Sequence, residues 1–237
     1  MLVEIWSDVV CPWCAIGKVR FERALSGFAA GAGTDVDVRW RSFELDPGAP
    51  PVIDGPYVER LAAKYRTSTA QAQAMIDRMT QQAAAEGLRF DFAVARPGNT
   101  FDAHRLLHLA ADHGLQHPVK ERLLAGALSQ GVPIGSAPAL RRLAVAAGLP
   151  GDAVDEVLAG DRYADAVRAD ERQAMVYGIT GVPFFVIDRR LGVSGAQPSA
   201  VLRQALEQAL HAAPAPAATD HAGHDPRACA DGSCAVA

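Results

Sequence analysis

Two cysteines separated by two residues, Cys11 and Cys14, constrain this chain more than any other feature. They follow a short apolar run at residues 2–6 and open an amphipathic stretch at residues 12–30. Pro12 suits the first position of a helix, because proline lacks the backbone N–H that would have no partner there. Unpaired N–H groups and the positive end of the helix dipole favour a thiolate at Cys11. The motif therefore predicts a strand, a turn and a helix, with Cys11 as nucleophile and Cys14 as the thiol that resolves its mixed disulfides.

Charge and hydrophobicity exclude several classes of function. The 237 residues are 49% hydrophobic and 21% charged, as in ordinary globular proteins. The net charge of -4 provides no basic surface for nucleic acid or for an acidic membrane. No apolar run reaches the roughly 18 residues of a membrane span, and no signal-peptide core precedes the cysteines. We therefore expect a cytoplasmic protein that binds neither nucleic acid nor membrane.

The remaining pattern predicts an α/β chain with a long helical insert. A second strand is indicated by alternation at Val36, Val38 and Trp40. Helices are expected at residues 57–66, 69–86, 100–113, 118–130, 137–147 and 152–159, and a short extended piece at 88–92. After a helix at 163–177, the chain returns to strands at 184–188 and 191–194 and a closing helix at 198–211.

Three motifs carry a resemblance to a known family. They are SDVVCPWC at residues 7–14, Asn99-Thr100 followed by Ala103-His104-Arg105-Leu106, and GITGVPFFV at residues 178–186. With these motifs the chain resembles the DsbA-like disulfide oxidoreductases of thioredoxin fold, and within them the cytosolic FrnE branch. The resemblance covers about residues 2–211. It implies a thioredoxin-like domain formed by 1–55 and 161–211, an inserted all-helical domain at 56–160, and a tail at 212–237, which its composition predicts to be flexible.

The same resemblance identifies a site around the cysteines. It implies a cis peptide bond between Val182 and Pro183 beside the CPWC motif, with Pro183 part of the catalytic site. Val182, Pro12, Trp13 and His104 are expected to contact the client. For His104 the alternative is a packed histidine inside a helix. Because Trp13 carries no charge, we expect a weaker oxidant than the periplasmic members, which have an imidazolium between the cysteines.

A second pair, Cys229 and Cys234, lies in the tail. The resemblance implies a second redox pair of this spacing in some members, able to exchange with the first. The alternative is a metal site made by His221, His224, Cys229 and Cys234, and a third reading is an inert tail. We expect no metal elsewhere in the chain.

These observations predict a thiol–disulfide oxidoreductase or isomerase acting on protein disulfides, with no cofactor beyond its redox-active disulfide. Its expected electron partners are glutathione, another small thiol or a thioredoxin system. Glu44 is a candidate acceptor for the Cys14 proton, against the alternative of a solvent-facing carboxylate.

Two other functions stay open. One is a glutathione-dependent isomerase or transferase of the 2-hydroxychromene-2-carboxylate isomerase type, whose members usually carry serine at the first thiol position. The other is a redox- or metal-sensing binding protein.

Overall fold

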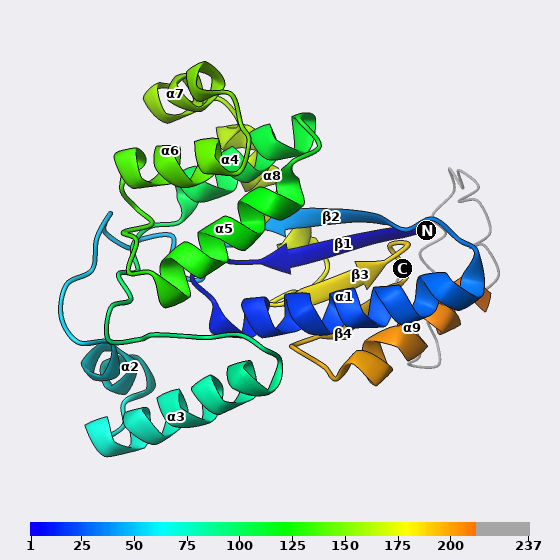
Figure 1. The fold of residues 1–237 in the computed structure, drawn as a ribbon, viewed down its shortest axis with the longest axis horizontal. Helices are drawn as coiled ribbons and strands as arrows, with labels where there is room; N and C mark the ends of the chain where they lie inside the picture. The colour runs from blue at the N-terminus through cyan, green and yellow to red at the C-terminus, as the bar shows by residue number, and fades with distance from the viewer. Residues whose placement is uncertain (212–237) are drawn as a thin grey trace, which may run out of the picture.

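A mixed sheet forms the centre of the computed structural model, which describes residues 1–211 except for the side chains of residues 30–32 (Figure 1). The strand order is β2-β1-β3-β4. β1 (Leu2–Ser7) runs parallel to β2 (Asp37–Ser42) and antiparallel to β3 (Phe184–Ile187), and β3 runs antiparallel to β4 (Leu191–Ser194). The tail lies outside the described residues, together with the candidate ligands and redox pair His221, His224, Cys229 and Cys234.

Helices cover both faces of the sheet, and β1 buries a large apolar side chain on each side. Val3 and Ile5 point to α1 (Pro12–Ala32) and α9 (Ser199–His211), which lie side by side (Figure 1). Trp6 points the other way, packs on α8 (Ala164–Val176) and donates its indole N–H to the Asp170 carbonyl at 2.9 Å. This burial fixes the end of β1, from which the CPWC segment follows.

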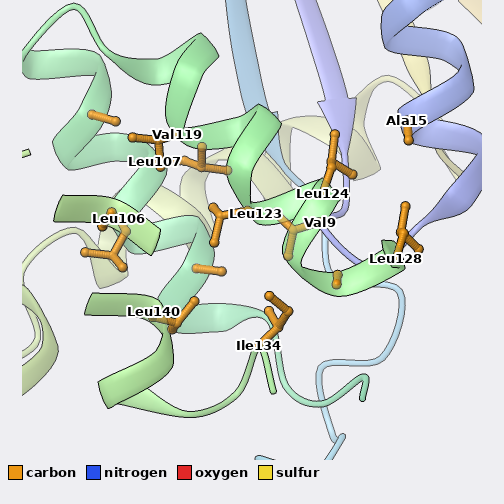
Figure 2. Packing of buried hydrophobic residues seen from close by; sticks show 14 of the residues in the cluster. Val9, Ala15, Leu106, Leu107, Val119, Leu123, Leu124, Leu128, Ile134 and Leu140 are labelled. Atoms are coloured by element: carbon orange, nitrogen blue, oxygen red, sulfur yellow. The ribbon is translucent and has the colours of Figure 1, made fainter. Parts of the chain in front are cut away.

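The helical region begins after β2 and its loop. It consists of α2 (Tyr57–Tyr65), α3 (Thr69–Ala85), α4 (Phe101–Asp112), α5 (Gln116–Ser129), α6 (Ala137–Ala146) and α7 (Gly151–Ala159). In Figure 2, the side chains of α5 extend from the α4 leucines to Val9 and Ala15, on either side of the CPWC turn. This helix therefore connects the insert to the segment that carries the cysteines. Among the described residues, no helix is both long and apolar enough to span a bilayer.

The expected fold class is confirmed, and one local expectation is wrong. The α/β order and the helical insert match the elements predicted from the sequence. Residues 88–92 form no strand. Phe90 and Phe92 instead bury their rings beside Tyr57, whose ring centroid lies 4.6 Å from that of Phe92. The division into 1–55 with 161–211 and 56–160 stays a prediction, because one apolar cluster joins Ile16 of α1 to the inserted helices.

Candidate active site

The CPWC motif lies at the start of α1, as expected. Cys11 is the N-cap residue with φ −90° and ψ 114°, and Pro12 follows in the first turn. The Cys11 carbonyl accepts the Cys14 backbone N–H at 3.1 Å. Both thiols are unbridged and buried, with Cys11 4% exposed and Cys14 fully covered. The nucleophile is thus close to the surface, whereas its partner faces the interior.

A cis peptide bond between Val182 and Pro183 lies against the first thiol, which confirms the expectation from the resemblance. The Cys11 Sγ is 3.7 Å from the Val182 carbonyl oxygen. Gly17, one turn beyond the motif, makes this approach of helix and loop feasible. A Cβ at position 17 would lie 2.8 Å from Pro183 Cγ, closer than real contacts allow. Sequence reasoning missed Gly17, because the close approach joins segments far apart in the chain.

The two thiols have opposite acidities. Interaction with the Cys14 thiol lowers the pKa of Cys11 and outweighs burial, and the N–H groups of Cys14 and Trp13 act in the same direction. Burial, followed by the Cys11 group, raises the pKa of Cys14 well above its ordinary value. The thiolate therefore forms at Cys11, which is the requirement for a nucleophile with a separate resolving thiol.

The residues expected to contact a client divide into two groups. Trp13 is 42% exposed and Val182 is partly exposed, so both are accessible beside Cys11. Pro12 and Pro183 are buried. Pro12 is covered as the first residue of α1, and its expected client contact stays a prediction.

The position of His104 corrects an expectation. Its side chain is fully buried in α4, so a client cannot reach it. Its Nε2 lies 3.4 Å from Asp8 Oδ1, and neither ring nitrogen has a hydrogen-bond partner among the described residues. The alternative of a packed histidine is the correct one. The helix periodicity does not reveal this, because it cannot tell which segment a helix face meets.

Asp8 is a buried carboxylate three residues before Cys11. Its Oδ1 accepts the Val9 backbone N–H at 2.7 Å, and its Oδ2 accepts the Leu45 N–H at 2.8 Å. Burial alone would raise its pKa, but His104, the Leu45 N–H and the Lys120 charge lower it below the ordinary value. The aspartate is therefore held ionised, and its charge raises the pKa of the neighbouring Cys11.

Lys120 of α5 is fully buried on the inner side of the motif. Its Nζ donates to the Ser7 carbonyl at 3.4 Å and lies 5.5 Å from the centre of the Trp40 ring. Burial lowers its pKa to about 8, against the opposing influence of the Cys14, Asp8 and Cys11 charges. Sequence reasoning missed this residue. The signal was a lysine within the apolar stripe of a helix, at positions 120, 123, 124 and 127.

Glu44 does not face solvent, so the alternative of a solvent-facing carboxylate is wrong. Its side chain is buried, and Arg168 of α8 donates to Glu44 Oε2 at 2.6 Å and to Glu171 Oε2 at 2.6 Å. Burial raises the pKa of Glu44 to about 7, although Arg168 opposes the shift.

Within residues 1–211, no three His, Cys, Asp or Glu side chains are grouped so that they could hold a metal ion.

The fold and the family of the chain follow from comparison with known proteins. Its architecture is that of the thioredoxin-like proteins with a helical insert. Residues 2–207 match the DSBA-like thioredoxin domain, and the chain belongs to this family. Among its relatives, the uncharacterized protein YwbO of Bacillus subtilis is 29% identical over 210 residues, which cover 86% of this chain and 94% of YwbO.

Solved structures agree with this assignment. A probable DsbA oxidoreductase from Streptomyces coelicolor is 47% identical, with a TM-score of 0.85 and coverage of 100% of this chain and 99% of that chain. The cytosolic disulfide reductase DsbM from Pseudomonas aeruginosa with GSH is 20% identical, with a TM-score of 0.60 and coverage of 89% and 99%. The second likeness shows a shared fold.

Proposed function

We propose that this protein catalyses thiol–disulfide exchange on protein clients in the cytoplasm, as a member of the FrnE branch. The observation that carries the proposal is the placement of the Cys11 thiol at the N-terminus of α1, 3.7 Å from the carbonyl of Val182 before the cis proline. Cys11 is the thiol of the pair that retains exposure, 4% against none for Cys14, and we expect the loop to offer backbone groups to an extended client beside it. The similarity to a probable DsbA oxidoreductase supports the same chemistry.

The reaction proceeds in two exchange steps. The Cys11 thiolate attacks one sulfur of a client disulfide, the client S–S bond breaks, and the other client sulfur leaves as a thiolate that takes up a proton. The Cys14 thiolate then attacks the Cys11 sulfur, which releases the client as a dithiol and forms the Cys11–Cys14 disulfide. The client gains two electrons and the protein loses them. If a second client thiolate attacks the client sulfur of the mixed disulfide before Cys14 reacts, a new client disulfide forms and Cys11 leaves as a thiolate, which is isomerisation.

A small thiol such as glutathione, or a thioredoxin system, returns the protein to the dithiol. In a reducing compartment the dithiol is the resting form, which favours reduction and isomerisation over net oxidation of clients. The tail pair, Cys229 and Cys234, is proposed as a second redox unit that exchanges with the CPWC motif.

Cysteine variants of the full-length protein test the proposal by insulin reduction and by reactivation of scrambled ribonuclease. We expect Cys11→Ser to abolish both activities and Cys14→Ser to accumulate a mixed disulfide with the client, visible by mass spectrometry. The double variant Cys229→Ser, Cys234→Ser isolates the CPWC motif from the tail. Activity that survives in Cys11→Ser refutes the proposal. Turnover of a chromene substrate after alkylation of both CPWC thiols would instead favour the glutathione-dependent isomerase.

A further inference from the structure

A cavity of about 720 Å³ lies in the helical insert. It is bounded by the start of α2, by one face of α3 at positions 73, 76, 77 and 80, and by the segment 90–93. None of its lining residues belongs to the CPWC turn or to the cis-proline loop. Its volume is within the range of roughly 300–1,000 Å³ that ligand pockets occupy. The two exchange steps give this space no role.

The apolar part of the cavity is aromatic. Phe90 and Phe92 are each 8% exposed, and their ring centroids lie 5.7 Å apart in an edge-to-face arrangement. The Tyr57 ring packs on Phe92, with the two centroids 4.6 Å apart. The backbone N–H of Asp91 donates to the Leu128 carbonyl of α5 at 2.8 Å, which fixes the segment between the two phenylalanines. The cavity thus offers a preformed apolar surface to an apolar side chain.

Two carboxylates make the cavity negative. Asp77 and Asp91 line it, and in each the Oδ1 atom accepts a hydrogen bond from a neighbouring donor, at 2.7 and 3.1 Å respectively. Their Oδ2 atoms have no partner within residues 1–211, and none of the residues that line the cavity is a lysine, arginine or histidine. Arg60 lies against the Tyr57 ring but outside this lining, and its guanidinium donates to the Ile53 carbonyl at 2.9 Å. The charge of the cavity therefore complements a cationic side chain.

The insert holds this cavity on the side of the molecule where the thiols lie. Glu86, at the end of α3, accepts hydrogen bonds from two arginines of α1 at 2.6 and 2.7 Å, which ties α3 to the helix that carries the cysteines. Figure 1 shows α2 and most of α3 beyond the end of α1 at which the CPWC motif lies. Tyr57 packs against the same apolar cluster as Val10, the residue before the motif. A client whose disulfide meets Cys11 can therefore extend towards the cavity.

We propose that this cavity binds a client segment in which a large apolar side chain stands next to a lysine or an arginine. This inference rests on the proposed function. The apolar side chain covers the rings of Phe90 and Phe92, and the cationic group pairs with Asp77 and Asp91. Incompletely folded proteins expose apolar side chains of this kind. Binding at a point remote from the thiols raises the effective concentration of the client disulfide at Cys11.

The charge of the cavity also argues against the tail of this chain as its occupant. Residues 212–237 contain three aspartates and a single arginine, and the terminal carboxylate adds a further negative charge. Such a segment is repelled by two unpaired carboxylates. A client with a basic residue beside an apolar one has the opposite charge, so it is the occupant that the lining favours.

Three peptides, each with one cysteine capped by thionitrobenzoate, test the apolar and the cationic contact separately. The cysteine is flanked on both sides by phenylalanine with lysine, by serine with lysine, or by phenylalanine with glutamate. The reduced full-length protein, with its tail cysteines replaced by serine, attacks the peptide sulfur through Cys11. The bond to thionitrobenzoate breaks, and stopped-flow absorbance of the released anion gives a second-order rate constant.

We expect the peptide with phenylalanine and lysine to react fastest. Replacement of its phenylalanine by serine should slow the reaction about tenfold, the scale of a largely buried aromatic side chain. Replacement of its lysine by glutamate should slow it about threefold or more, the scale of exposed ion pairs, and this second difference should shrink at high salt. If the wild-type protein favours neither phenylalanine nor lysine, the inference is wrong.

Variants of the lining locate these preferences. The double variant Asp77→Asn, Asp91→Asn keeps the acceptor oxygens and removes the charges, so it should lose the preference for lysine over glutamate and retain that for phenylalanine over serine. The matched control is Asp161→Asn, Asp165→Asn, which removes two exposed aspartates at the start of α8 and should retain both preferences. A preference for lysine that survives in the first double variant, or falls equally in both, overturns the assignment.

A variant that fills the cavity tests its apolar part. Ala93 is an exposed lining residue, so Ala93→Trp should occupy the space and reduce both preferences. Ala63→Trp is the control, at an exposed position of α2 outside the lining, and should behave as wild type. Unchanged preferences in Ala93→Trp would show that the client binds elsewhere and refute the inference. If the wild-type protein releases no thionitrobenzoate from any of the three peptides, the proposed function itself fails.

Discussion

Gly17 and Pro183 are in contact at a point where no side chain fits. A Cβ on residue 17 would lie 2.8 Å from Pro183 Cγ, and Pro183 is held in place because its carbonyl accepts the Gly195 N–H at 2.8 Å. The helix that carries the thiols and the loop that carries the cis peptide are thus joined directly. The same helix and loop place Cys11 Sγ 3.7 Å from the Val182 carbonyl oxygen.

Gly17→Ala should therefore damage the site although alanine is the better helix former. We expect a loss of about 1–3 kcal/mol in the free energy of unfolding, typical of overpacking, together with slower insulin reduction. Urea denaturation measures the first effect. Gly27→Ala is the control on the same helix, since its Cβ would lie 3.6 Å from Arg203 Cδ, an ordinary contact. That variant should be neutral or slightly stabilised, and an equal loss in both variants would show that the Pro183 contact is not the cause.

Replacement of Asp8 by asparagine should make Cys11 a stronger acid. The Asp8 charge raises the pKa of the Cys11 thiol, so its removal lowers that pKa. The rate of alkylation by iodoacetamide should then reach half its maximum at lower pH than in the wild-type protein. Stability should fall by about 1–3 kcal/mol, because an amide cannot accept both the Val9 and the Leu45 N–H. The control is Asp46→Asn, at an exposed position in the loop after β2. This variant should leave the pH profile of alkylation unchanged.

Trp13 is the exposed aromatic side chain beside the nucleophile, and tryptophan contributes strongly to binding when a partner covers it. Trp13→Ala should lower kcat/KM for insulin about tenfold or more. The reaction of Cys11 with iodoacetamide, which needs no protein contact, should change little. Met175→Ala removes another exposed apolar side chain, in the last turn of α8, and should not affect insulin reduction. Equal losses with insulin and iodoacetamide would mean that Trp13 acts on the thiol rather than on the client.

Local signals explain why so much of the fold was predictable. Pro12 in the first turn, the apolar run of β1 and the alternation in β2 are visible in neighbouring residues. Helix ends are visible in the same way at glycines such as Gly114 and Gly148, which both have positive φ. These signals located the thiols and the elements around them. The cis peptide at Pro183, in the third motif, was expected only from the family resemblance.

Contacts between distant segments explain what the sequence could not predict. His104 meets Asp8 and Lys120 meets Ser7, in each case across about a hundred residues of chain. Periodicity indicates that position 120 lies on the buried stripe of α5, but not that this stripe faces the CPWC turn. The inward orientation of His104 is hidden for the same reason. The polar groups behind the motif therefore became visible only through tertiary packing.

Glu44 should make the stability of the protein depend on pH. Its pKa is about 7 in the folded protein, against an ordinary value of 4.5. Between these pH values the folded state holds a proton that the unfolded state has released, so the free energy of unfolding falls as pH rises through this window. Glu44→Gln removes the titration and keeps an acceptor for Arg168. Its stability relative to wild type should increase from about pH 4.5 to about 7 and then level off, as measured by urea denaturation across pH.

A second variant tests the cause of this dependence. Glu171 shares Arg168 with Glu44, and after burial its carboxylate is the main influence that raises the Glu44 pKa. Glu171→Gln removes that charge, so the pKa of Glu44 should fall and the loss of stability should occur at lower pH than in the wild-type protein. If the stability curves of wild type and Glu44→Gln instead run parallel across this pH window, Glu44 is ionised throughout. The effect of Arg168 on the Glu44 pKa would then outweigh the effect of burial.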